Sequence, residues 1–97
     1  MLVKESPGPG AATDHRIDLP AAGRAEALFT SDLSAWVPHT PTEVTAAIRR
    51  AIRINGGIEG CMAAMASAYG DHPETAAPRM RWARAVAQRS HENSRRN

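Results

Sequence analysis

The residues best suited to chemistry in this chain are one cysteine and a few histidines, which are scattered along its length. Cys61, His39, His72 and His91 are the candidate ligands for a metal ion. No two of them have the C-x-x-C or H-x-x-x-H spacing with which a structural zinc site is usually built. We therefore expect no metal and no cofactor, and we interpret Cys61 as a small buried apolar side chain.

Two residue pairs have types that occur in catalysis. Cys61 and His72 could act as a nucleophile and its base, but the neighbours of Cys61 are glycine, methionine and alanine, which offer no charge to activate a thiol. Asp71 beside His72 resembles an acid–base pair, yet an aspartate before a helix is more simply a cap.

Gly56 and Gly57 precede a helix without the strand or the lysine of a nucleotide-binding fingerprint. We predict that the protein is not an enzyme.

The distribution of charge says more about partners than about catalysis. Eleven of the twelve cations are arginine. Residues 1–48 hold three cations and six carboxylates, a net charge of −3, whereas residues 49–97 hold nine arginines and four carboxylates, a net charge of +5. Arginine suits bidentate contacts with phosphate or carboxylate, so this asymmetry favours a partner for the second half. Codon usage rich in guanine and cytosine would enrich arginine and alanine equally well, and both explanations stay open.

The elements that must position these residues are helices. The 97 residues suffice for one domain, and their 42% of hydrophobic residues are mainly alanine. No segment alternates with period two, so no sheet is expected. The prediction is an all-α domain of four short helices over residues 21–89, with a disordered arm over 1–20 and a disordered basic tail over 90–97. The apolar periodicity places the four helices at residues 21–36, 41–54, 58–69 and 76–89.

Capping residues set the expected helix boundaries. Thr40–Glu43 form a capping box with proline at the first helical position. Gly56–Gly57 supply a left-handed stop, and Gly70 is expected to stop the third helix. Asp71 is expected to cap the fourth helix, and Pro78 to fall in its first turn, where N–H groups have no helical partner.

The same periodicity predicts which side of each helix faces the core. Trp82 is expected at the edge of the fourth helix's core side, half-buried near Leu28 or Trp36. On the third helix, glycine and alanine opposite the large residues would let another backbone approach closely. The expected core residues are Ala25, Leu28, Phe29, Leu33 and Trp36; Val44, Ala47, Ile48, Ala51, Ile52 and Ile54; Ile58, Met62, Met65 and Tyr69; and Ala76, Met80, Ala83, Val86 and Ala87.

Two functions fit this design. The first is a small non-enzymatic binding module, a protein–protein adaptor or a homodimer, with Trp36 and Trp82 as partner contacts, because tryptophan is favoured at such surfaces. The second is a regulator that binds DNA or RNA through a helix-turn-helix-like αα-hairpin made by the third and fourth helices. Its contacts would be the exposed polar residues Arg81, Arg84, Gln88, Arg49 and Arg53.

The expected location is the cytoplasm. No apolar run approaches the roughly 20 residues of a membrane span, and the first residues lack the apolar stretch of a secretory signal. The run GCMAAMASAYGDHPE over 60–74, followed by RMRWAR over 79–84, resembles a group of short actinobacterial helical proteins. The likeness covers about residues 25–87. It implies a cytoplasmic bacterial protein and brings no catalytic residue with it.

Overall fold

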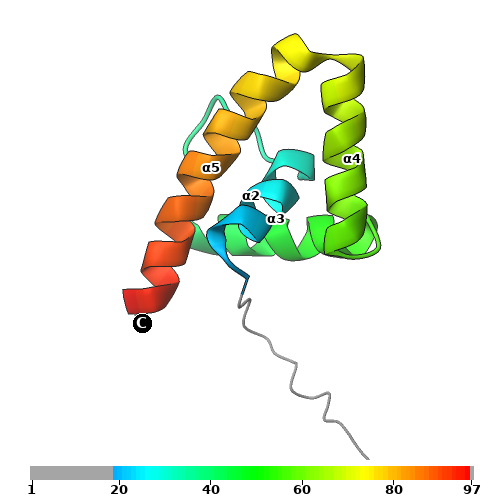
Figure 1. Ribbon diagram of the computed structural model, residues 1–97. Helices are drawn as coiled ribbons and strands as arrows, with labels where there is room; N and C mark the ends of the chain where they lie inside the picture. The colour runs from blue at the N-terminus through cyan, green and yellow to red at the C-terminus, as the bar shows by residue number, and fades with distance from the viewer. Residues whose placement is uncertain (1–18, 97) are drawn as a thin grey trace, which may run out of the picture.

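Figure 1 shows that the longer helices form the sides of a triangle around the shortest one. The computed structural model describes residues 19–96, and within them it contains helices and no strand. The central helix contacts each of the other three. The prediction of an all-α, four-helix domain is confirmed, whereas the arm predicted over 1–20 lies outside the described residues except for its last two positions. The helices are α2 (Ala21–Thr30), α3 (Pro41–Ile54), α4 (Ile58–Asp71) and α5 (Pro73–Arg96).

The core lies where α2 meets its three neighbours. Leu28 of α2 and Ile48 of α3 are among the largest fully buried side chains. Half of the buried apolar residues are alanines, so the helices approach closely and the core stays small. Every residue predicted for the core side of α5 is buried. These residues are Ala76, Met80, Ala83, Val86 and Ala87.

A buried arginine, Arg24, joins α2 to α5, the first and the last of the described helices. Arg24 is only 3% exposed, and its Nη1 donates to Ser90 Oγ on α5 at 2.8 Å. Its Nε donates to the carbonyl of Leu19 at 2.9 Å. A buried arginine is stable only when its donors are satisfied, so this contact ties the start of α2 to the last third of α5.

α3 has the boundaries that its sequence predicts. The Glu43 N–H donates to Thr40 Oγ1 at 3.1 Å, and the Thr40 N–H donates to Glu43 Oε1 at 2.9 Å, which completes the capping box. Gly56 and Gly57 have φ of 77° and 120°, as a left-handed stop requires. One expectation is wrong: Ile54 is 72% exposed, because it lies in the last turn of α3, beyond the buried stretch that ends at Ala51.

The turn between α3 and α4 allows no side chain at Gly60. A Cβ on this residue would overlap the carbonyl oxygen of Asn55. Asn55 itself is held by its side-chain amide, which donates to Ala51 O at 2.8 Å. The close backbone approach predicted for the small side of this helix is therefore made at Gly60 by the preceding turn, whereas Ala63 and Ser67 of the same side are exposed.

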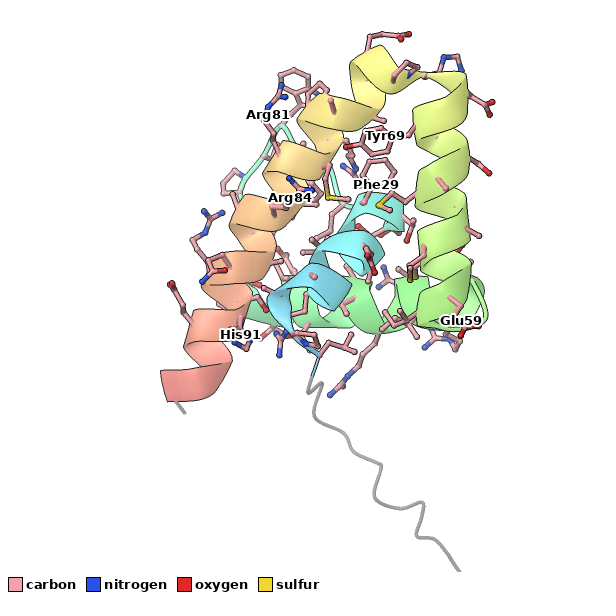
Figure 2. The ribbon with its side chains drawn as sticks, viewed as in Figure 1. Phe29, Glu59, Tyr69, Arg81, Arg84 and His91 are labelled. Carbon is pink, nitrogen blue, oxygen red and sulfur yellow. The ribbon has the colours of Figure 1, made fainter. Side chains whose placement is uncertain are left out.

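The core side of α4 differs from the expected one. Cys61 is fully buried, as predicted, whereas Met62, expected in the core, is exposed and Met65 is half-buried. Tyr69 is partly exposed but stacks on Phe29 of α2, with ring centroids 6.0 Å apart and an interplanar angle of 13° (Figure 2). The buried stripe of α4 is thus shifted by one residue from Met62 to Cys61.

α2 ends at Thr30, six residues before the predicted end. Thr30 Oγ1 donates to Ala27 O at 3.0 Å, and Ser31 Oγ donates to Leu28 O at 2.7 Å. Short hydroxyl side chains compete for backbone carbonyls in this way, and here they close the helix. Residues 31–40 form a loop, so Trp36, predicted to face the core from a helix, lies on this loop and is exposed.

The junction between α4 and α5 also differs from the prediction. α4 continues through Gly70 and ends at Asp71, which therefore does not cap α5. Only His72 separates the two helices, and its carbonyl accepts from the Ala76 N–H at 2.9 Å. α4 and α5 form the predicted αα-hairpin, but with a connection shorter than the three or four residues usual in a helix-turn-helix.

α5 is longer at both ends than expected. It begins at Pro73, whose fixed φ favours the first helical position, so Pro78 lies inside the helix rather than in its first turn. Proline has no N–H, so a carbonyl in the preceding turn lacks its helical donor. Because Pro78 is exposed, this carbonyl lies on the solvent side of the helix. The tail predicted over 90–97 is helical as far as Arg96. Gln88 Nε2 donates to Glu92 Oε2 one turn later, at 3.3 Å, and no glycine or proline follows Pro78.

Candidate functional site

The Arg79 side chain, which sequence reasoning did not single out, donates four hydrogen bonds to backbone carbonyls. Its Nε donates to Phe29 O at 3.1 Å, and its Nη1 donates to Leu33 O at 2.7 Å. Its Nη2 donates to Leu28 O at 3.2 Å and to Ser31 O at 2.9 Å. Carbonyls at the end of a helix have no helical donor, so Arg79 supplies the partners that the end of α2 and the following loop need.

The position of Arg79 is fixed from the other side by an aromatic ring. The guanidinium carbon lies 4.3 Å from the ring centroid of Trp82, one turn further along α5. Desolvation by burial lowers the pKa of Arg79 from its ordinary value. A signal for this role is present in the sequence, because residue 79 lies three residues after Ala76 and four before Ala83, on the core-facing side of the helix.

Trp82 is half-buried and packs against the core, as predicted. It lines a hollow of about 140 Å³ together with Val37, Pro38 and Val44, where the loop enters α3. Trp36 does not cover it, because Trp36 stands out in solvent. Trp82 is therefore foremost a packing residue that supports Arg79 and the end of the loop.

Trp36 is the most exposed large apolar side chain of the described residues, at 93%. The loop that carries it is nevertheless tied down on both sides. The Trp36 N–H donates to Ser34 Oγ at 3.0 Å, and His39 Nε2 lies 2.7 Å from Ser34 O, which can only accept. Arg79 holds the adjacent carbonyl of Leu33. The indole is thus presented to solvent by an anchored backbone.

An open hollow of about 590 Å³ lies beside Trp36. One wall is the loop and the other is formed by the first two turns of α5. Apolar atoms dominate the lining, and Glu74 supplies a carboxylate there. The volume is enough for one or two side chains of a partner. The lining residues are Ser34, Ala35, Trp36, Glu74, Thr75, Pro78 and Arg79.

The polar side chains predicted for nucleic acid are all exposed, but they lie on different parts of the surface. Arg49 and Arg53 are on α3. Arg84 and Gln88 line a second hollow, of about 370 Å³, with Ala25, Glu26 and Met65. Figure 2 shows Arg81 on the outer flank of α5 and Arg84 on the flank that faces the inside of the triangle. The structure therefore divides them between α3 and two flanks of α5.

Cys61 and His72, considered as a nucleophile and its base, are not brought together. Cys61 is fully buried, with Sγ 3.7 Å from Ala51 O, whereas the His72 side chain is largely exposed at the end of α4. Within residues 19–96, no group of three or more histidines, cysteines or carboxylates could hold a metal ion. In the same residues, no helix has both the length and the apolarity to cross a membrane.

No protein-family model, curated protein or solved structure matches this chain. Function is therefore inferred from the chain's own surfaces. Among these, the surface formed by Trp36 and the adjoining hollow, here named the Trp36 face, combines an exposed aromatic side chain, an anchored backbone and an apolar concavity.

Proposed function

We propose that this protein is a small non-enzymatic binding module that engages a protein partner through the Trp36 face. The observation that carries the proposal is the 93% exposure of Trp36 on an anchored loop. A fully exposed indole contributes nothing to the core, and its burial by a partner would recover apolar area worth roughly 25 cal/mol per Å². Tryptophan is accordingly enriched among the residues that dominate binding energies.

Anchoring of the loop supports the same function. Residues that are already ordered lose little conformational entropy when a partner binds, so more of the contact energy is realised as affinity. Arg79 and His39 order the loop on both sides of Trp36. The proposal includes a cytoplasmic location, which the free cysteine at position 61 supports, because free thiols are usual in reducing compartments.

A capture experiment tests this function. The full chain, the Trp36→Ala variant and an Ile54→Ala variant are immobilised and exposed to lysate of the native host. Ile54 is the matched control, because it is also a large exposed apolar residue but lies at the far end of α3. We expect at least one protein bound by the wild type and by Ile54→Ala and lost with Trp36→Ala. Identical bound proteins for all three chains would refute the role of Trp36.

A second candidate, nucleic-acid binding, is favoured by the exposure of Arg81, Arg84 and Gln88 on α5. These side chains are of types that contact phosphates and base edges. If DNA or RNA is the partner, affinity should fall steeply with salt through counterion release, and Arg81→Ala and Arg84→Ala should weaken binding without unfolding the chain. Trp36→Ala should then leave the affinity unchanged. A gel-shift assay at several salt concentrations separates the two functions.

A further inference from the structure

The Trp36 face contains a projection and a cavity side by side. Trp36 stands in solvent at the rim of the hollow, and its backbone N–H donates to Ser34 Oγ. In a twofold dimer both subunits use the same surface, so an axis that passes between a projection and a cavity brings the projection of each subunit to the cavity of the other. A second copy of this chain would therefore place each Trp36 side chain against the hollow of its neighbour.

The charges beside the hollow fit the same arrangement. Glu74, Pro78 and Arg81 follow one another at i, i+4 and i+7, so they share one face of α5. Glu74 is 72% exposed, and the group that faces it among the described residues is His72, with Nδ1 3.9 Å from its carboxylate. Arg81 is exposed and lies on the outer flank of the helix (Figure 2). Glu74 and Arg81 are about 10.5 Å apart along the helix axis, too far to pair within one chain.

An antiparallel crossing of two α5 helices brings these charges together. If the twofold axis passes between Ala77 and Pro78, Glu74 of one copy stands opposite Arg81 of the other, and the pair occurs twice. The side chains at the axis are small, so the helices can approach closely. The outer sides of α3 and of the later α5 suit self-association less well, since they carry Arg49, Arg53 and Arg89.

We propose that the partner of the Trp36 face is a second copy of this chain, bound in a twofold dimer in which Glu74 pairs with Arg81 across the axis. The inference rests on the proposed function, because it takes Trp36 as the binding residue. The contact involves one loop and about three turns of α5, so the interface belongs to the small, concentration-dependent class.

Analytical ultracentrifugation of the full chain, from micromolar to several hundred micromolar, tests the dimer. We expect reversible dimerisation, and we expect Trp36→Ala to raise the dissociation constant about 30-fold, the loss typical of a dominant interface residue. Ile54→Ala should leave it unchanged. Glu74→Arg and Arg81→Glu should each weaken the dimer, and the double variant Glu74→Arg/Arg81→Glu should recover the wild-type dissociation constant within about threefold. Circular dichroism confirms that each variant is folded.

The outcomes separate this inference from the proposed function. A chain that stays monomeric throughout overturns the dimer, whereas a Trp36-dependent complex with another protein in the capture experiment would still support the binding module. A dimer that survives Trp36→Ala overturns the assignment of this face. A folded double variant that fails to associate overturns the antiparallel pairing, and with it the proposal.

Discussion

Substitution of Arg79 by alanine should be among the most damaging single changes in this protein. The side chain donates four hydrogen bonds to carbonyls of α2 and the following loop, at 2.7 to 3.2 Å, and lies over the Trp82 ring. Hydrogen bonds to a charged group contribute about 1.5–3 kcal/mol each, but they are not additive when they share one guanidinium. The guanidinium is also only partly buried, which reduces each contribution through contact with water.

We therefore expect Arg79→Ala to lower the free energy of unfolding by about 3 kcal/mol, the contribution of one to two hydrogen bonds from a charged donor. A chain of this size has a total stability on the order of 5–10 kcal/mol, so the loss is a third or more of it. The melting temperature should fall by roughly 12–24 °C. Arg79→Lys keeps the charge but not the planar fork, and should lose about half as much.

Urea denaturation followed by far-ultraviolet circular dichroism measures these losses. Arg81→Ala is the matched control, because Arg81 is exposed on the same helix and its replacement should change the stability by less than about 0.5 kcal/mol. If Arg79→Ala and Arg81→Ala unfold at the same urea concentration, the four carbonyl contacts do not stabilise the fold and the reasoning is refuted. The loop that carries Trp36 would then need another explanation for its order.

Three further predictions concern packing and caps. Gly60→Ala should destabilise the fold by about 1–3 kcal/mol, because the added Cβ overlaps the carbonyl of the preceding turn. Gly70 has open space around it, so Gly70→Ala should stabilise α4 by about 0.5–1 kcal/mol. The melting temperatures of the two variants should therefore move in opposite directions. Thr40→Ala should cost about 1 kcal/mol through loss of the capping box, and an unchanged melt would show that the cap is not needed. Trp82→Ala should lower the melting temperature and Trp36→Ala should not, and equal melts would contradict the assignment of one indole to the core and the other to solvent.

Much of the fold follows from local signals in the sequence. α3 could be predicted residue by residue, because Thr40, Glu43 and the two glycines after Asn55 fix its ends through neighbours close in the chain. The buried side of α5 could be predicted because its apolar positions repeat every three or four residues. The end of α2 could not be predicted correctly. Its apolar residues keep a helical spacing as far as Trp36, whereas the hydroxyls of Thr30 and Ser31 close the helix.

The candidate site was harder to predict than the fold. Trp36 was predicted to be a contact residue from its type alone, and that role stays a prediction, whereas the loop on which it lies follows from the early end of α2. Arg79 was missed because all of its partners are backbone carbonyls 46 to 51 residues earlier in the chain. The periodicity places residue 79 on the core side of α5, but only the assembled fold brings these carbonyls to its side chain.

The central place of α2 has a consequence for how the chain must be made. α2 is the first of the described helices to be synthesised, and α5, which covers much of it, is the last. The contacts that close the fold join Phe29 to Arg79 and Arg24 to Ser90. When only α2, α3 and α4 have left the ribosome, the apolar part of α2 that α5 covers is therefore still exposed to water. Folding therefore waits for nearly the whole chain, and contacts of such long sequence separation slow it relative to a simple helical hairpin. A nascent chain truncated before Arg79 should remain a substrate for chaperones and proteases rather than become a smaller stable domain.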